Sequence, residues 1–258
     1  MGTFRYFIHL AYDGRDFYGW QVQPSDPSVQ YELEKSLSML LRHPVKVTGA
    51  GRTDTGVHAR NYFAHFDEPV PLSYETAKDL TYRLNRVLPD SIAVYGIFPV
   101  QPTIHARFSA VFRTYQYFIS RIKDPFVQEY SLRYEGPLET AAMQKAAAMV
   151  TEYSDFTCFA KAGSQTGTNK CNVIESELVI SETGIIYRVK ADRFLRNMVR
   201  AIVGTLMEVG KGNLDLIRYR DILEGGTRSD AGESVPAHGL FLENVEYPLG
   251  FRADFHDL

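Results

Sequence analysis

The spacing of apolar residues in the first hundred positions changes between the two-residue period of a strand and the wider period of a helix. Apolar side chains alternate over residues 4–12, which predicts a strand, and Asp13-Gly14 predicts the turn after it. Ser28 is a typical N-cap for a helix whose apolar positions run over residues 29–41. The other elements predicted here are strands over 45–48, 62–66 and 92–98, a loop over 49–56, and a helix that begins after Ser73 and ends at Pro89. The predicted order is therefore βαββαβ.

A second, similar round of elements follows an interruption at Gln101-Pro102. The pattern predicts a long strand over 110–121 and a hairpin over 172–191. Residues 156–172 are rich in Gly, Ser and Thr and predict a long loop. Helical spacing over 195–209 predicts a helix, with Gly210 as the residue just beyond its end. The remaining predicted elements are helices over 138–150 and 214–223 and a last strand over 240–247.

The two rounds predict an α+β fold made of two βαββαβ-like halves. Each half would be a mainly antiparallel sheet with helices on one face. We expect an N-terminal domain over 1–103 and a C-terminal domain over 104–258, with a cleft between the halves, which is a common place for a functional site. The repeat is one of element order alone, because the halves share no identity at the level of residues.

The composition excludes several classes of protein. A chain of 258 residues, 45% of them apolar, folds without help from disulfides or metal and is neither disordered nor fibrous. Its two cysteines, Cys158 and Cys171, are not a Cys-x-x-Cys pair, so we expect no disulfide scaffold and no cysteine zinc site, and a cytoplasmic location. Residues 1–12 lack the pattern of a signal peptide, and no apolar run approaches about 18 residues, so we expect no membrane association.

The charges are unevenly distributed along the chain. The net charge of −3 by itself disfavours a nucleic-acid partner. However, residues 101–123 include basic side chains and no acidic one. Five of the six charged side chains over 187–200 are basic, whereas eight of the ten over 221–258 are acidic. Two interpretations stay open, a local basic surface on an acidic protein and a random scatter of solvated charges.

The densest group of polar residues lies over 49–59. Three glycines there allow a tight backbone path, and four polar side chains within seven residues would be costly to bury without partners. These side chains are Arg52, Thr53, Asp54 and His58. The segment is therefore the first candidate for chemistry.

The residues alone leave more than one interpretation of this segment. It could be an Asx-type turn, in which Asp54 bonds its own backbone and Arg52 is solvated. A phosphate-binding loop is disfavoured, because the glycine spacing and the Gly-Lys-Ser/Thr ending of such loops are missing. A metal site from Asp54, His58 and His65, and with it a metal hydrolase, is a further alternative, although these residues do not have the spacing of ligands.

The stretch from Gly51 to Ala59 closely resembles the catalytic loop of the tRNA pseudouridine synthase A family. Other stretches resemble further motifs of that family in the same chain order, so the resemblance covers nearly the whole chain. They are residues 12–14, 17–21, 105–110, 113, 115–117, 155–157, 194, 198–200, 203–206 and 237–242. The chain departs from the family pattern with Thr55 in place of Ala and Cys158 in place of Ser. It is also poor in arginine over 163–171, which leaves open whether that loop contacts RNA.

The resemblance implies an isomerase that converts uridine to pseudouridine in tRNA. The family acts at positions 38, 39 and 40 of the anticodon stem-loop, breaking the glycosidic bond to N1 and joining C5 to the same sugar carbon. The reaction involves neither redox chemistry nor hydrolysis, so the resemblance implies no cofactor and no metal. It also implies a homodimer in the cytoplasm.

The resemblance assigns catalytic roles to three residues. Asp54 is the catalytic carboxylate, acting as a nucleophile or as a base. Arg200 matches the arginine that pairs with this aspartate, and a guanidinium nearby favours the charged carboxylate. Tyr115 would stack on the uracil, and its hydroxyl could assist loss of the C5 proton. The alternative for Tyr115 is a place in the core, which is what we expect for Tyr117.

The resemblance also assigns residues to RNA binding. Arg52 would fill the space that the extruded uridine leaves in the stem. His105, Arg107 and Phe108 would contact the RNA backbone and a base face. A purely structural role is the alternative for His105.

Two other functions compete with the isomerase. One is a non-catalytic RNA-binding module, since sheets with exposed aromatic side chains bind single strands. The other is the metal hydrolase on Asp54 and His58. The presence of Asp54, Tyr115 and Arg200 together favours the isomerase, because binding alone does not need a buried carboxylate.

Overall fold

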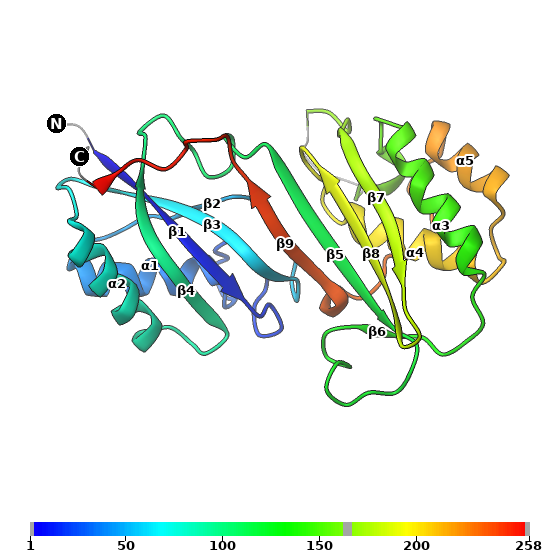
Figure 1. Cartoon of the computed structure of the whole chain (residues 1–258), viewed down its shortest axis with the longest axis horizontal. Helices are drawn as coiled ribbons and strands as arrows, with labels where there is room; N and C mark the ends of the chain where they lie inside the picture. The colour runs from blue at the N-terminus through cyan, green and yellow to red at the C-terminus, as the bar shows by residue number, and fades with distance from the viewer. Residues whose placement is uncertain (1–2, 162–166, 256–258) are drawn as a thin grey trace. The chain divides into compact units, whose positions relative to one another are not determined.

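A computed structural model describes residues 3–161 and 167–255 and confirms the α+β class. Nine strands and five α-helices lie within these residues (Figure 1). The pairings of β1 with β3 and β4, of β2 with β3, and of β8 with β5 and β7 are antiparallel, whereas β5 and β6 are parallel. The prediction of a mainly antiparallel fold is therefore confirmed.

The chain divides into two compact units. Unit 1 comprises described residues 3–111 and 242–255, and unit 2 comprises those between 112 and 241. Compactness alone does not show that a unit is a domain able to fold on its own. The division into domains 1–103 and 104–258 stays a prediction, and each unit is described by itself.

Unit 1 is built around strand β1 (Phe4–Tyr12), which pairs with β3 (His58–Glu68) on one side and β4 (Ile92–Val100) on the other. The short β2 (Thr48–Gly49) pairs with β3, and β9 (Leu240–Glu246) is the next neighbour of β3. The chain order up to β4 is the predicted βαββαβ.

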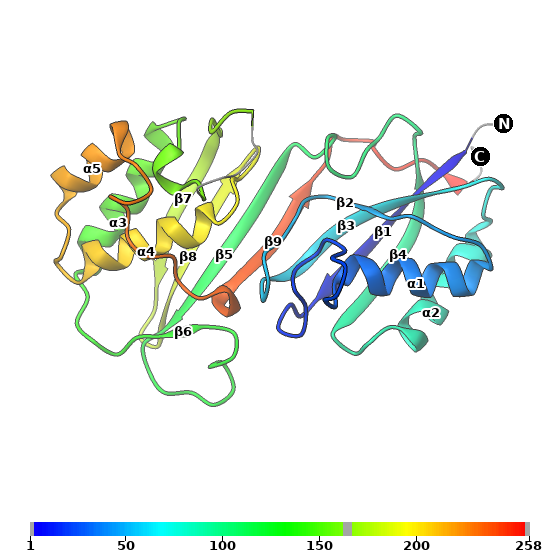
Figure 2. The same cartoon turned by 180° about the vertical axis from the view of Figure 1, so that it is seen from behind.

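Helices cover one face of this sheet. Helix α1 (Val29–Leu41) begins after the predicted cap Ser28, and helix α2 (Tyr74–Val87) begins after Ser73. In Figure 2, α1 crosses the sheet of unit 1 in front of its strands, and α2 lies next to it. Alternate side chains of β1 are fully buried on that side of the sheet, namely Tyr6, Ile8 and Leu10.

The other face of the same sheet is covered by the end of the chain. Phe7 and Phe63, on neighbouring strands, meet Tyr247 with ring centroids 5.2 and 5.4 Å apart. Phe98 of β4 meets Phe251 at 6.0 Å. The C-terminal segment therefore completes the hydrophobic core of unit 1.

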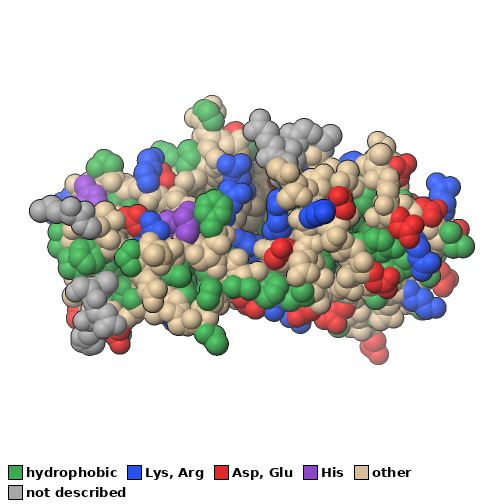
Figure 3. All heavy atoms as spheres, turned by 90° about the horizontal axis from the view of Figure 1, so that it is seen from above, with side chains coloured by type: hydrophobic (Ala, Val, Ile, Leu, Met, Phe, Trp, Pro, Cys, Tyr) green, Lys and Arg blue, Asp and Glu red, His purple; other side chains and the backbone are tan. Residues whose placement is uncertain are grey.

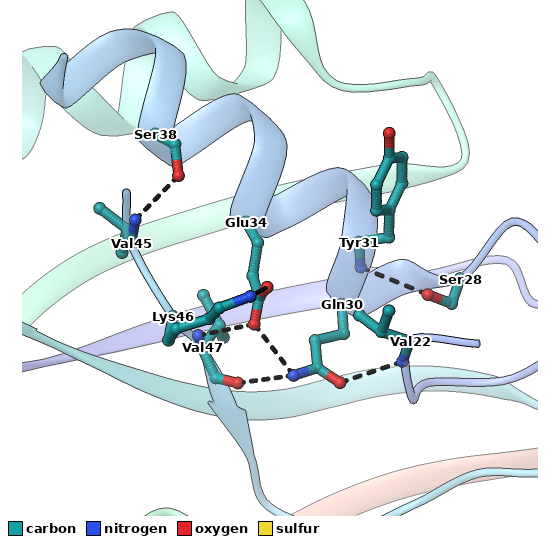
Figure 4. A network of polar contacts seen from close by, with 9 residues as sticks. All are labelled: Val22, Ser28, Gln30, Tyr31, Glu34, Ser38, Val45, Lys46 and Val47. Carbon is teal, nitrogen blue, oxygen red and sulfur yellow. Dashed lines mark hydrogen bonds and ion pairs between the residues drawn. The ribbon is translucent and has the colours of Figure 1, made fainter. Parts of the chain in front are cut away.

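The strand predicted over 45–48 is wrong, because only Thr48 belongs to β2. The backbone before it is bound by polar side chains of α1 instead of by a neighbouring strand (Figure 4). Ser38 accepts a hydrogen bond from the Val45 amide at 2.9 Å, and Glu34 accepts one from the Val47 amide at 3.1 Å. Gln30 donates to the Val47 carbonyl at 2.9 Å. These side chains satisfy the groups that a strand would have paired.

Unit 2 contains a sheet in the order β5-β8-β7. The strands are β5 (Phe112–Ser120), β8 (Gly184–Ala191) and β7 (Val173–Ile180), and the two-residue β6 (Leu132–Arg133), which the pattern did not predict, pairs with β5. Two helices contact this sheet, and a third packs against those two. They are α3 (Thr140–Met149), α4 (Met198–Gly210) and α5 (Leu216–Gly225).

The prediction for Gly210 is wrong. Gly210 is the last residue of α4, and the left-handed backbone occurs at Gly212, with φ of 76°. A Cβ on Gly210 would lie 2.4 Å from the sulfur of Met143, so α3 packs closely against this end of α4.

The segment predicted as a loop over 156–172 has some structure of its own. A 3₁₀ turn covers Thr157–Phe159, and an isolated bridge joins Asp155 to Lys170. Residues 162–166 lie outside the described residues, so the question of RNA contacts over 163–171 falls partly outside them. Throughout residues 3–161 and 167–255, the helices are too short or too polar to cross a bilayer.

Candidate active site

The residues predicted for the site fall into two groups. Unit 1 carries Asp54 and Arg52 on one loop and residues 105–108 on another. Unit 2 carries Tyr115 and Arg200.

The Asp54 loop follows β2 and is held by the segment that follows β1. The Trp20 amide donates to the Thr53 carbonyl at 3.3 Å, and the Gly56 amide donates to the Phe17 carbonyl at 3.3 Å. The Val57 amide donates to the Asp54 carbonyl at 3.1 Å and closes the turn. The motif over 17–21 therefore serves as the backing of the Asp54 loop.

Glycine is required where these two segments touch. Gly19 has a φ of 90°, and a Cβ there would lie 2.4 Å from the Thr53 carbonyl oxygen. A Cβ on Gly14 would lie 2.0 Å from the Val57 carbonyl oxygen. Any side chain at either position would push the Asp54 loop away.

Buried aromatic side chains complete the support of this loop. Tyr12 Oη lies 2.9 Å from Thr53 Oγ1, and both residues are buried. The Tyr62 hydroxyl donates to the Gly51 carbonyl, and the Tyr62 ring lies 4.2 Å from that of Trp20. On this base Asp54 is half-buried and Arg52 is exposed.

His58 and His65, the two histidines of the proposed metal site, each place a ring nitrogen within hydrogen-bonding distance of other groups of the protein. His58 is buried, and its Nδ1 atom lies 3.1 Å from the Gly14 amide nitrogen and 3.1 Å from Asp13 Oδ1. His65 Nδ1 accepts a hydrogen bond from the Ala106 amide at 3.1 Å. Within the part of the chain that the structure describes, no three His, Cys, Asp or Glu side chains are grouped to hold a metal ion.

The second loop of unit 1 presents an aromatic and a basic side chain. His105 Nδ1 accepts hydrogen bonds from the amides of Arg107 and Phe108 at 3.1 and 3.3 Å. Phe108 is 76% exposed, and the guanidinium carbon of Arg107 lies 5.4 Å from the centre of its ring. An exposed ring with a cation beside it has the chemistry to bind a base and a phosphate.

Tyr115 lies on β5 of unit 2, where it pairs with Val189 of β8. It is half-buried, and its ring meets Phe194 edge-on at 5.0 Å and 83°. Tyr117 is fully buried, as expected, and its hydroxyl donates to the Pro236 carbonyl at 2.9 Å. Burial raises the pKa of Tyr117, whereas Tyr115 keeps part of its surface in solvent.

Arg200 lies in the first turn of α4 and is fixed by the segment before β9. Its Nε atom donates to the Val235 carbonyl at 2.7 Å, and the Val235 amide donates to the Arg200 carbonyl at 3.2 Å. Gly204 lets this segment approach, since a Cβ there would lie 1.7 Å from the Glu233 carbonyl oxygen. The Thr205 hydroxyl accepts from the Gly232 amide at 3.0 Å. These contacts explain why α4 carries glycine and threonine one turn after Arg200.

Sequence reasoning missed the residues that hold the site loops. Gln30 and Glu34 of α1 bind the chain just before the Asp54 loop. Arg5 binds the carbonyls of Pro102 and Ile104, just before the 105–108 loop, and His65 binds the Ala106 amide within it. One signal was available, because Glu34 stands next to the apolar Leu33 and Leu37 on the buried side of a helix. A carboxylate at such a position needs a partner.

The chain is similar to known proteins over nearly its whole length. A family model described as tRNA pseudouridine synthase matches residues 152–248. Proteins named tRNA pseudouridine synthase A are 48% identical in Porphyromonas gingivalis over 95% of this chain and 97% of the relative, and 49% identical in Bacteroides thetaiotaomicron over 95% and 91%. The relative of that name from Shewanella amazonensis is 39% identical over 96% and 94%. This chain belongs to the tRNA pseudouridine synthase A family.

Proposed function

We propose that this chain converts uridine to pseudouridine in tRNA. The observation that carries the proposal is the Asp54 loop, which is braced by two glycine contacts and a buried hydroxyl pair while Asp54 itself stays half-buried. Relatives that match nearly the whole chain are named for this activity. A rigid loop that keeps a carboxylate partly in solvent suits a group that must act on a substrate.

The reaction we propose is an isomerisation that needs no second substrate. The bond between N1 and the sugar carbon breaks, the uracil turns, a bond forms between C5 and that carbon, and the C5 proton is lost while N1 gains one. Asp54 acts as the nucleophile or the base. Arg200 takes the role of the arginine that the family pairs with this aspartate, and Tyr115 stacks on the uracil and assists removal of the C5 proton.

The substrate we propose is the anticodon stem-loop, at positions 38, 39 and 40. A base in a stem cannot be reached until it is extruded, so Arg52 takes the place that the flipped uridine leaves. His105, Arg107 and Phe108 contact the RNA next to it. The exposed Arg52 side chain and the exposed Phe108 ring support this division of roles.

Further parts of the proposal concern the state of the enzyme. We propose a homodimer that works in the cytoplasm and needs neither a cofactor nor a metal ion. Supporting the last point, His58 and His65 direct a ring nitrogen to protein backbone amides.

A tritium-release assay tests the activity. Transcribed tRNA labelled at C5 of uridine should release tritium with the wild-type protein. Asp54→Asn should slow release by at least about 10³, roughly 4 kcal/mol of barrier, while tRNA binding stays nearly intact. Binding without release by the wild type would instead favour a non-catalytic RNA-binding module.

A further inference from the structure

We propose that Arg5, Asp67 and His65 are positioning residues that lock the segment 101–109, here named the platform loop. In the locked loop Phe108 and Arg107 are ready to bind an unpaired base and a phosphate of tRNA. The inference rests on the proposed function and extends it to residues that never touch the substrate. All of the contacts that carry it lie within unit 1.

Arg5 binds the start of the platform loop and Asp67 at the same time. Its Nη1 atom donates to the carbonyls of Pro102 and Ile104 at 3.2 and 3.1 Å. Its Nε and Nη2 atoms donate to the two carboxylate oxygens of Asp67 at 2.8 and 2.9 Å. Arg5 and Asp67 face each other in the register of β1 and β3, so Asp67 fixes the direction of the guanidinium. Lysine lacks the planar fork that makes both sets of bonds.

His65 binds the middle of the platform loop from the next strand position on that face. Its Nδ1 atom accepts from the Ala106 amide at 3.1 Å, and the Tyr247 hydroxyl donates to the Ala106 carbonyl at 2.6 Å. Burial, with smaller effects of Arg5 and His105, lowers the pKa of His65 to about 4. The ring is therefore neutral near pH 7, and Nδ1 keeps the lone pair that the amide needs.

His105 connects the fixed part of the platform loop to the exposed side chains of Arg107 and Phe108. Its ring lies 4.7 Å from that of His65 and 4.5 Å from that of Phe108, and its Nδ1 atom holds the amides of Arg107 and Phe108. In Figure 3, histidine side chains (purple) lie beside an exposed hydrophobic side chain (green) on the left half of the molecule. The Phe108 ring is 76% exposed although hydrogen bonds to His65 and His105 fix the backbone that carries it. A large apolar side chain held in solvent in this way is suited to contact a binding partner.

The physical gain from such a lock is that binding does not have to order the loop. Immobilising flexible groups at an interface costs free energy, and a loop that is already fixed avoids this cost. Bases stack on exposed aromatic rings and phosphates pair with guanidinium groups in single-stranded RNA recognition. The lock should therefore affect tRNA affinity and leave the chemical step alone.

The test combines a measure of loop order with a mutant cycle in the full-length protein. In Arg5→Ala, hydrogen exchange at the amides of Ala106 and Phe108 should be faster, and the Kd for transcribed tRNA should rise about tenfold. The single-turnover rate at saturating tRNA should change by less than about twofold. Arg5→Ala should weaken binding no further in a background that already carries Arg107→Ala and Phe108→Ala.

Arg83→Ala is the matched control, because it removes the same charge from an exposed ion pair with Asp79 on α2, 3.5 Å long. If Arg5→Ala binds tRNA like this control, or if its loss adds in full to that of Arg107→Ala/Phe108→Ala, the proposal is overturned. Should Arg5→Ala not fold, Asp67→Asn replaces it, with a smaller change in the same direction expected. Failure of the proposed function is distinct, since the wild type would then bind tRNA without tritium release.

Discussion

Tyr12, the last residue of β1, places its hydroxyl 2.9 Å from the hydroxyl of Thr53, the residue immediately before Asp54. The central strand of unit 1 is thus connected directly to the loop that carries the proposed catalytic carboxylate. Both residues are buried, so water cannot replace either partner without a rearrangement.

Tyr12→Phe should weaken the protein and slow the reaction with little effect on tRNA binding. The substitution leaves the Thr53 hydroxyl buried without this partner, which costs about 1–2 kcal/mol of the free energy of unfolding. We expect a lower single-turnover rate at saturating tRNA, because the Asp54 backbone loses a support. Tyr82→Phe, at a position 66% exposed on α2, is the control. Equal rates for the two variants would show that the bond does not position Asp54.

Gly204→Ala should reduce the rate by displacing the segment that holds Arg200. The added methyl group would lie 1.7 Å from the Glu233 carbonyl oxygen, two residues before the carbonyl that accepts from Arg200 Nε. Overpacking of this kind costs about 1–3 kcal/mol of stability. Gly225→Ala, where nothing lies within 4 Å of the new methyl group, should change neither stability nor rate by much. A normal rate in Gly204→Ala at full stability would contradict the role given to the Val235 contact.

The stability of the protein should depend on the titration of His65. Its pKa of about 4 in the folded protein lies below the value of about 6.5 in an unfolded chain. Between these values the unfolded chain binds a proton that the folded protein does not, so stability falls as the pH falls. The loss from this residue between about pH 7.5 and about pH 5 should be about 2 kcal/mol.

Urea unfolding of wild type and His65→Asn at both pH values measures this loss. Asparagine keeps an acceptor for the Ala106 amide and does not titrate, so the variant should lose about 2 kcal/mol less than the wild type on acidification. Parallel pH profiles for the two proteins would mean that His65 is protonated in the folded state as easily as in the unfolded one.

Arg52→Ala should impair paired target uridines more than unpaired ones. If Arg52 fills the stack after extrusion, it stabilises a state that costs a few kcal/mol to reach in a stem and less at a mismatch. Arg52→Lys should rescue poorly, because lysine lacks the flat stacking plane. Single-turnover rates on matched and mismatched stem-loops measure the difference, with Arg83→Ala as the charge control. Equal losses on both substrates would exclude this role.

Local patterns predicted much of the fold but not how distant segments meet. Alternating apolar residues predict β1, and the N-cap Ser28 predicts the start of α1, because each of these signals lies within a few residues of the chain. The strand over 45–48 failed because side chains of Gln30 and Glu34 replaced a strand partner. No local signal shows that a helix will bind a backbone in this way.

In the candidate site too, features set by neighbouring residues were predicted and features set by distant contacts were not. The Asp54 loop was visible in the sequence because its glycines and polar side chains are contiguous. Arg5 was not, since it is one charged residue of a strand and its role depends on pairing with Asp67, 62 positions away. The platform loop became a candidate through the resemblance, whereas its support required the register of β1 and β3.

The return of Tyr247 and Phe251 to the sheet of unit 1 has a consequence for synthesis on the ribosome. When residue 111 has been made, the apolar side chains of Phe7, Phe63 and Phe98 still lack their cover. At about 5–20 residues per second, the rest of the chain takes on the order of ten seconds. During that time the nascent unit has an open apolar face, so the core of unit 1 can be completed only after unit 2 has been synthesised.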